Sequence, residues 1–353
     1  MFEIQNGLSY VFLLVLIIHS CCVYFRIRSS GKGENKAYTL DDVEIIIPAR
    51  NEERNLKILL PLLNLIYPDV KVTVVNDGST DGTGLVPALY GFSCIQGSPL
   101  PPGWTGKNWA CMQGAQRSKQ KVLLFLDADV KLLKGSLEKA LKALGPESPL
   151  VSAIPIHDQS QWYTKFFFGF WVYVFLGSEF FGKRFCIGQF MMMESRWYFD
   201  FGGHDKVKGT MAEDLSFVNL VISQKKTYTL LEPGIFEVNM YPDGIDTFMK
   251  GWKRLFQSAQ SRLSFLVFGV TIAYLAGFVN SIVDLFAGHY LLFAAYTLVH
   301  GAQMRFLKLK GFNLVFLPLS LMFFALLNLW AIVYRVFFKN QMVWKGRTFQ
   351  EKF

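Results

Sequence analysis

The chain has 353 residues, of which 52% are hydrophobic and 16% aromatic, a more apolar composition than that of a typical soluble protein. Its formal net charge of +9 suits anionic partners, but many basic residues flank apolar stretches, and no nucleic-acid-binding module is recognisable. Composition therefore favours contact with a membrane and argues against a nucleic-acid partner. The five cysteines form no CxxC pair and no zinc spacing, which favours a reduced, cytosol-facing region.

The first apolar stretch, residues 7–25, carries no charge over 19 positions, just enough to cross a hydrocarbon core of about 30 Å. Arg26 and Arg28 follow it, which predicts an N-terminus outside and the following residues in the cytoplasm. A cleaved signal peptide is the alternative. It lacks support because no basic segment precedes the stretch and no clear cleavage site follows it. We therefore expect residues 1–26 to be a transmembrane anchor.

A βαβ pattern occupies the next part of the chain, within an expected cytosolic domain of residues 27–262. Apolar runs at 43–49, 70–78 and 121–130 alternate with amphipathic segments that have leucines at helical spacing. Such a pattern predicts an α/β fold with a parallel sheet that is covered on both faces.

Polar residues follow each of these three runs, and ligands of parallel sheets bind at the carboxyl ends of the strands. Asp77 ends the second run, and Asp127 and Asp129 end the third. Two carboxylates held close together repel unless a cation neutralises them, and this oxygen chemistry suits Mg²⁺ or Mn²⁺ bound together with a diphosphate. The alternative is that Asp129 only caps the turn that follows.

Apolar stretches return later in the chain. Residues 166–177, within a segment near 162–182, are too short to span and predict an interfacial helix or a buried core helix. Residues 263–353 are expected to form C-terminal transmembrane helices and a basic tail. Three crossings would put that tail outside, against the positive-inside rule, so we expect 264–300 to contain a re-entrant or interfacial piece and the tail to be cytosolic.

Four motifs in this order, IIIPARNEERNL, VVNDGSTDGT, FLDADV and MAEDLSF, resemble the family 2 glycosyltransferases, which have a GT-A fold, a Rossmann-like nucleotide-diphospho-sugar transferase domain. The resemblance covers roughly residues 43–230. PPGWTGKNWACMQGA, GGHD and the terminal WKGRTF further resemble the membrane-bound carotenoid-acid glucosyltransferases of the diaponeurosporenoate type. Hopanoid-associated transferases share some of these features.

The resemblance implies roles at matching positions. Asp77 would contact uridine, and Asp127 and Asp129 would contact the ribose, the metal and the diphosphate. The base and ribose pocket would be lined by Pro48, Ala49, Arg50 and Glu52.

Lys107 lies in GWTGKNWA, where Gly103 and Gly106 allow a close bend and Trp104 and Trp109 offer rings for a sugar face. We expect Lys107 to contact the diphosphate or sugar; an exposed surface lysine is the alternative.

MAEDLSF contains the expected catalytic carboxylates. By resemblance, Asp214 is the base and Glu213 supports it, although the two are also typical of a helix N-terminus. His204 and Asp205, in GGHD, are weaker candidates for shaping the pocket.

The sequence lacks the QxxRW motif of processive relatives, which argues against a polysaccharide synthase. In its place are the basic and aromatic residues Trp252, Lys253 and Arg254, which are expected to contact the diphosphate and the acceptor headgroup. The tail residues Trp344 and Arg347 resemble an element that closes over the donor.

The expected function is a metal-dependent, inverting transfer of a sugar, most simply glucose from UDP-glucose, to a polyisoprenoid or carotenoid-type lipid. The expected protein is an integral membrane protein with a cytoplasmic catalytic domain. Ceramide, diacylglycerol or a hopanoid are alternative acceptors, and a non-catalytic scaffold that binds lipid or nucleotide sugar is an alternative from another class. A transporter is disfavoured because the apolar segments contain few ionisable residues.

Overall fold

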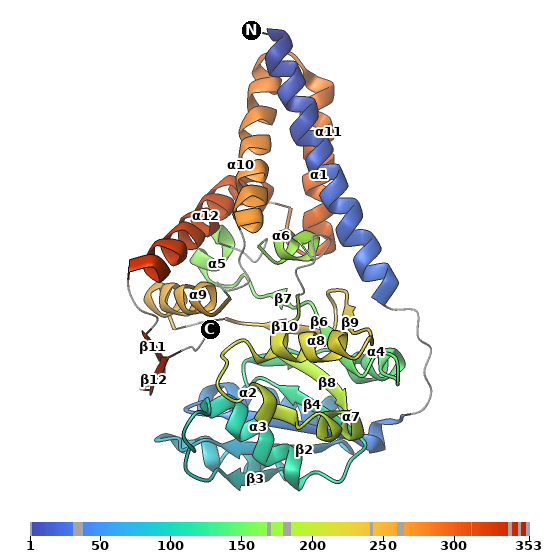
Figure 1. Cartoon of the computed structure of the whole chain (residues 1–353), viewed down its shortest axis with the longest axis vertical. Helices are drawn as coiled ribbons and strands as arrows, with labels where there is room; N and C mark the ends of the chain where they lie inside the picture. Colours follow the sequence, from blue (N-terminus) through green and yellow to red (C-terminus); the bar gives the residue numbers. More distant parts are fainter. Residues whose placement is uncertain are drawn as a thin grey trace.

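The computed structural model describes residues 2–30, 38–167, 171–178, 185–240, 243–259, 265–311, 313–337, 341–344 and 347–350. From top to bottom, Figure 1 shows a stalk of long helices with the N-terminus at its tip, a layer of shorter helices, and an α/β domain.

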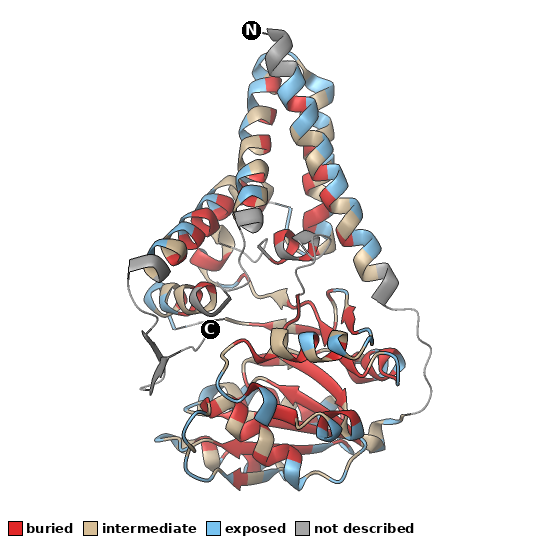
Figure 2. Ribbon diagram, viewed as in Figure 1, coloured by how far each residue is buried: buried red, intermediate tan, exposed pale blue. Residues whose placement is uncertain are grey.

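A seven-stranded sheet forms the centre of the α/β domain. Its strand order is β3-β2-β1-β4-β8-β6-β9, and only β8 runs antiparallel to its neighbours. Figure 2 shows its central strands almost entirely buried, as the unbroken apolar runs predict. The strands are β1 (Val43–Ala49), β2 (Lys71–Asn76), β3 (Ser93–Gln96), β4 (Val122–Leu126), β6 (Leu150–Ala153), β8 (Phe190–Glu194) and β9 (Thr229–Leu231).

Helices join and cover these strands. In α2 (Glu53–Ile66), the leucines at helical spacing are the buried residues, so this helix packs one face on the domain core. The other helices of the domain are α3 (Gly106–Arg117), α4 (Ser136–Ala143), α7 (Ser195–Asp200) and α8 (Glu213–Ser223), with short 3-10 helices at Leu40–Asp42, Gly82–Gly84, Pro87–Tyr90 and Gly203–Val207.

A second, three-stranded sheet lies between the main sheet and the stalk (Figure 1). Its order is β5 (Val130–Leu132), β10 (Phe236–Val238) and β7 (Ile156–His157). These strands follow β4, β9 and β6, three parallel strands of the main sheet, so the small sheet covers the carboxyl edge of the large one. We call it the capping sheet.

The stalk consists of α1 (Phe2–Ser30), α10 (Phe265–Phe286) and α11 (Tyr290–Phe306). Gly288, with φ of +83°, turns the chain between α10 and α11, which run antiparallel. Buried polar contacts join α1 to this hairpin at two levels: Ser9 Oγ donates to Asp284 Oδ1 at 3.0 Å, and Tyr274 Oη lies 2.9 Å from His19 Nδ1. Such contacts between helices are favourable inside a bilayer.

Within the part of the chain that the structure describes, three helices are long and apolar enough to cross a membrane: α1 over Gly7–Ile27, α10 over Phe268–Phe286 and α12 over Asn313–Tyr334. Together with the main sheet they confirm the expected α/β fold with apolar helices at both ends of the chain. The proposed domain limits, and the side of the membrane on which each part lies, stay predictions.

Shorter helices connect the stalk to the domain. The apolar segment expected near 166–177 contains α6 (Trp171–Ser178), which packs against α1 and α10; residues 168–170 and 179–184 lie outside the described part of the chain. Helix α5 (Trp162–Phe166) contacts α12 (Asn313–Phe337), with the rings of Phe166 and Phe316 4.5 Å apart.

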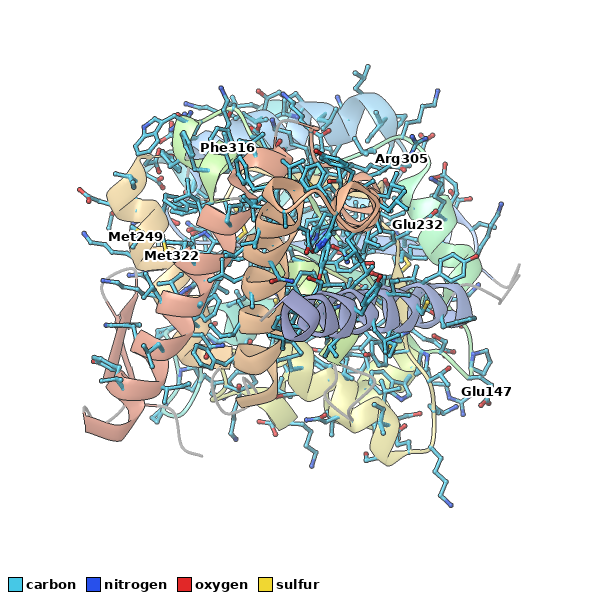
Figure 3. All side chains as sticks on the ribbon, turned by 90° about the horizontal axis from the view of Figure 1, so that it is seen from above. Glu147, Glu232, Met249, Arg305, Phe316 and Met322 are labelled. Atoms are coloured by element: carbon cyan, nitrogen blue, oxygen red, sulfur yellow. The ribbon has the colours of Figure 1, made fainter. Side chains whose placement is uncertain are left out.

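Helix α12 also packs on α9 (Ile245–Ala259), and Figure 3 labels Met322 and Met249 where the two helices meet. A hairpin of β11 (Gln341–Trp344) and β12 (Arg347–Gln350) follows α12.

Candidate active site

The first half of the site is built by the loops after β1 and β2. Pro48 lies where it removes no hydrogen bond to β4, because the pairing of β1 with β4 ends at Ile46 while that with β2 continues to Ala49. The backbone N–H of Asp77 donates to Ala49 O at 2.8 Å, and Arg50 Nη1 donates to Asp77 O at 2.8 Å. The structure therefore brings Pro48, Ala49, Arg50 and Asp77 together at the carboxyl edge, as the sequence predicts.

Side chains fasten these two loops to each other. Asn51 has a φ of +53°, and its Oδ1 accepts from Thr80 N at 2.8 Å. Glu52 N donates to Thr83 Oγ1 at 2.8 Å, so the residue proposed for the ribose pocket lies at the same junction. The two strand ends thus form one connected rim.

Lys107 links the central strand to α8. Its Nζ lies 2.7 Å from Asp127 Oδ1 and 2.9 Å from Glu213 Oε1, and it donates to Gly188 O at 3.2 Å. Burial alone would lower the pKa of Lys107, but the two carboxylates outweigh it and hold the pKa well above the usual value. Lys107 is a charged, partly buried side chain between two carboxylates, and its contact with a diphosphate or sugar stays a prediction.

The position of Lys107 follows from the way α3 begins. Thr105 caps this helix by accepting from Asn108 N at 3.3 Å, while Thr105 N donates to Lys208 O at 2.8 Å. Asn108 Nδ2 donates to Val207 O at 2.8 Å and to Thr210 O at 2.9 Å, in the loop that leads to Glu213. The first turn of α3 is thereby tied to the loop that carries the expected catalytic carboxylates.

Glu213 and Asp214 occupy the first turn of α8, which confirms their position at a helix N-terminus, while their catalytic roles stay predictions. Glu213 is buried, whereas Asp214 is half-buried and its Oδ1 accepts from Leu215 N at 2.7 Å. A Cβ on Gly188 would lie 3.1 Å from Glu213 Oε1 and 3.4 Å from Asp214 Cβ, so a larger residue here would press on both side chains.

Asp127 and Asp129 flank the turn between β4 and β5. Asp127 N donates to Gln189 O at 3.1 Å, which fixes the turn against the start of β8. Burial, together with the charges of Asp127 and Glu52, raises the pKa of Asp129 to about 7, and Asp129 Oδ1 is a buried oxygen without a hydrogen-bond partner.

These oxygens fit a divalent cation. A cation would relieve the repulsion and use the unpartnered oxygen, and no three His, Cys, Asp or Glu side chains among the described residues gather as a metal site by themselves. Two carboxylates completed by substrate phosphates are typical of Mg²⁺ sites.

His204 lies behind the site and not in it. It is fully buried among aromatic rings, and its Nδ1 lies 2.8 Å from Tyr198 Oη. Burial, helped by the charge of Lys107, lowers the pKa of His204 to about 3, so the ring is neutral at physiological pH. Asp205 instead points to solvent and pairs with Lys208 at 3.2 Å.

The structure does not bring the other predicted residues to the strand ends. Trp252 is buried on α9 against Phe324, with ring centres 5.0 Å apart, and Lys253 lies over the ring of Trp330 at 5.2 Å. Arg254 is on the same helix.

Trp344 and Arg347 are paired across the β11–β12 hairpin, which Figure 1 draws beside α9. Their side chains lie outside the described part of the structure. Their proposed contact with the donor therefore stays a prediction.

Similarities to known proteins agree with this geometry. Residues 44–198 match the family model "Glycosyl transferase family 2". The 4,4'-diaponeurosporenoate glycosyltransferase of Staphylococcus aureus strain MRSA252 is 26% identical over 295 residues, covering 80% of this chain and 79% of that protein; the protein of strain USA300 gives the same values.

Two solved structures are also similar. The mannosyltransferase PcManGT of Pyrobaculum calidifontis, in complex with GDP-Man and Mn²⁺, has a TM-score of 0.49 at 15% identity and covers 92% of this chain and 99% of its own. Glucosyl-3-phosphoglycerate synthase of Mycobacterium tuberculosis, in complex with Mn²⁺, UDP and glucosyl-3-phosphoglycerate, has a TM-score of 0.44 at 13% identity and covers 65% of this chain and 85% of its own.

Proposed function

We propose that this chain is a family 2 glycosyltransferase that transfers a sugar, with inversion, from a UDP-sugar to a polyisoprenoid or carotenoid-type lipid. Glucose is the proposed sugar. The proposed acceptor follows the relative in Staphylococcus aureus, whose name gives diaponeurosporenoate.

The observation that carries the proposal is the shared position of Lys107 between Asp127 and Glu213, at 2.7 Å and 2.9 Å. Asp127 belongs to the turn after β4, next to the rim formed by Arg50 and Asp77. Glu213 begins α8 and is followed by Asp214. A donor on the rim would thus meet, at the central strand, the carboxylate proposed to activate the acceptor, as a direct sugar transfer requires.

We assign the divalent cation, Mg²⁺ or Mn²⁺, to Asp127 and Asp129, because Asp129 offers a buried oxygen without a partner. When bound, the cation would supply positive charge to the diphosphate. Lys107 adds a fixed cation to the same region, and electrostatic stabilisation of this kind is worth about 10²–10³ in rate for a single group.

Asp214 is the proposed base. It removes the proton of an acceptor hydroxyl as that oxygen attacks the anomeric carbon, and the diphosphate leaves from the opposite side. If the acceptor is a carboxylic acid, it is already ionised near neutral pH, and Asp214 then orients the acceptor and removes no proton. Glu213 holds Lys107 in either case.

A lipid acceptor agrees with the position of the site in the molecule. The capping sheet and helices α5, α6 and α9 lie between the catalytic edge and the apolar stalk (Figure 1). We therefore propose an integral membrane enzyme whose α/β domain is cytoplasmic, next to the bilayer that holds the acceptor.

The test is mass spectrometry of lipids from membranes that contain the full chain, after incubation with Mn²⁺, UDP-sugars and a polyisoprenoid acid. We expect one lipid to gain a hexose, and we expect Asp127→Ala and Asp129→Ala to abolish the gain. Transfer that survives in Asp214→Asn would identify a carboxylate acceptor. A folded, UDP-binding protein that modifies no lipid would instead favour a scaffold.

A further inference from the structure

The capping sheet contains polar atoms that the reaction described above does not use. His157 Nε2 and Gln159 Nε2 are buried and have no hydrogen-bond partner among the described residues. Leaving a buried polar group unpaired is unfavourable, so two of them within three residues need a physical explanation.

These two residues lie on the acceptor side of the site. In the capping sheet, Val238 is paired with His157 on one side and with Val130 on the other. Val130 directly follows Asp129, so His157 lies two strand spacings, about 10 Å, from the metal-binding turn. The nucleotide rim at β1 and β2 is on the opposite side of β4. A group held at His157 would therefore face the donor across the central strand.

The same residues lie next to the apolar helices. Asp158 N donates to Val238 O at 2.9 Å, and Asp158 Oδ1 accepts from Ser160 N at 2.8 Å, which fixes the turn that contains Gln159. Helix α5 begins directly after this turn and packs on α12. Gln159 itself is 7% exposed. Gln159 and the Nε2 atom of His157 are thus buried between the catalytic edge and the helices that carry the apolar surface.

The surroundings of His157 define the chemistry of a ligand. Burial alone lowers the pKa of His157 to about 4, so the imidazole is neutral and carries one N–H. An amide nitrogen is a donor only. With the His157 proton on Nε2, the two free atoms are both N–H donors, and donors of this kind bind an oxygen atom.

We propose that His157 and Gln159 form a subsite for the oxygen-bearing end, a carboxylate or a hydroxyl, of the long-chain lipid acceptor. This inference rests on the proposed function, since it assigns the acceptor to a particular part of that site. The apolar remainder of the acceptor extends from this point toward α5 and α12. The two residues position the acceptor and do not take part in proton transfer.

The experiment uses the full chain in phospholipid nanodiscs, with all-trans-retinoic acid and retinol as probes of the two oxygen chemistries. Equilibrium binding of each radiolabelled probe is measured for the wild type, for His157→Phe and for Gln159→Met, and transfer from UDP-glucose is measured in parallel. Glu237→Gln is the matched control, because Glu237 is next to Val238 on the same strand and its side chain alternates to the other face.

We expect each variant to weaken binding of the preferred probe and to raise its KM about ten-fold to a hundred-fold, the usual effect of losing a hydrogen bond to a charged or strongly polar group. The KM for UDP-glucose and its slow hydrolysis by water should not change. His157→Gln, which keeps a donor, should recover most of the affinity. A preference for the acid identifies a carboxylate subsite, and a preference for retinol a hydroxyl subsite.

The inference is overturned if neither probe binds saturably to the wild type, or if folded variants bind as the wild type does. Should His157→Phe fail to fold, Gln159→Met in the turn decides the question. Saturable, variant-sensitive binding without any transfer would support the subsite and contradict the proposed reaction. Transfer with an unchanged acceptor KM in both variants would support the proposed reaction and contradict the subsite.

Discussion

Lys107 Nζ lies 2.9 Å from Glu213 Oε1, and the same ammonium lies 2.7 Å from Asp127 Oδ1. One lysine therefore joins the turn after β4, proposed to hold the cation, to the first turn of α8, which carries the proposed base. Since one positive charge serves two carboxylates, its loss would leave both facing each other in a largely buried site.

Replacing Lys107 by methionine should reduce kcat by about 100-fold, because a fixed charge at the diphosphate is removed and the start of α8 loses its tie to β4. Lys107→Arg keeps the charge and should retain more activity. The measurement is single-turnover transfer with saturating donor and acceptor. Lys121→Met is the control, since Lys121 makes an exposed ion pair with Asp42 at 2.8 Å. A wild-type kcat in Lys107→Met would exclude this role.

Asp129 should make the metal-free protein less stable as pH rises. Its pKa is raised to about 7 in the folded state by burial and by Asp127 and Glu52, so folding favours the protonated form. The folded state thus binds more protons than the unfolded state between the ordinary carboxyl pKa of about 4 and 7, and stability falls across this window.

Thermal unfolding of metal-free protein at pH 5 and pH 8 measures this effect. We expect the wild type to lose Tm relative to Asp129→Asn, which cannot ionise, as pH rises from 5 to 8, because the opposing contribution of His204 is common to both proteins. Mn²⁺ should restore the wild-type Tm at pH 8 and have little effect on the variant. Equal pH dependence in both proteins would show that Asp129 is not held protonated in the metal-free state.

The sequence predicted the parts of this molecule that depend on local patterns. The run VEIIIPA coincides with β1, and the ends of β1, β2 and β4 bring their polar residues to one edge. The fold class followed from these motifs and is confirmed, and residues 44–198 match the family model that the motifs resemble. Parallel strands with helical connections have few arrangements, so the strand ends indicated the site.

The partners of individual side chains were harder to predict because they depend on contacts between distant segments. The sequence indicated a phosphate or sugar ligand for Lys107, and the structure gives it two carboxylates. Asn108 follows Lys107 directly, yet its role in fastening α3 to the loop before α8 could not be seen without the fold. Trp252 was expected at the ligand because it is aromatic beside basic residues, but an aromatic residue packs equally well between helices, as it does against Phe324.

Tyr198 and His204 form a support behind the site whose loss should reduce stability. Tyr198 Oη lies 2.8 Å from His204 Nδ1 and accepts from His204 N at 3.1 Å. Tyr198→Phe leaves both buried nitrogens without this partner and should lower the free energy of unfolding by about 1–3 kcal/mol. Urea denaturation in detergent measures the change. Phe199→Leu, at a half-exposed ring, is the control. Tyr228→Phe is not used as a control, because the Tyr228 hydroxyl donates a hydrogen bond to Phe185 O.

His204 adds a pH dependence of opposite sign to that of Asp129. Its pKa is lowered on folding to about 3 by burial, while the unfolded ring titrates near 6.5. Below 6.5 the unfolded state therefore binds a proton that the folded state does not, and stability falls as pH decreases from 6.5 toward 3. His204→Asn should flatten this acid limb of the stability curve. An unchanged limb would mean that other groups cause the acid sensitivity.

The turn of the α10–α11 hairpin and its open end, where α10 begins and α11 ends, should lie on opposite sides of the membrane. Gly288 is at the turn near the N-terminal tip of the stalk, whereas the chain returns through α11 to the level of α5, where Asn313 Nδ2 donates to Lys165 O at 3.0 Å. Helix α12 then packs on α9, and Figure 1 draws the β11–β12 hairpin after α12, on the side of the α/β domain. This path keeps the basic tail on the side of the α/β domain, in agreement with the positive-inside rule.

Cysteine labelling in intact cells tests this arrangement, with the five native cysteines replaced by serine. Gly288→Cys should react with a membrane-impermeant maleimide from outside, and Gln341→Cys should react only after the cells are opened. Lys121→Cys, in the α/β domain, marks the cytoplasmic side. Because α12 is long and apolar enough to cross a membrane, labelling of Gln341→Cys from outside would mean that α12 spans the bilayer and that the tail is far from the site. The proposed closure of Trp344 and Arg347 over the donor would then have to be abandoned.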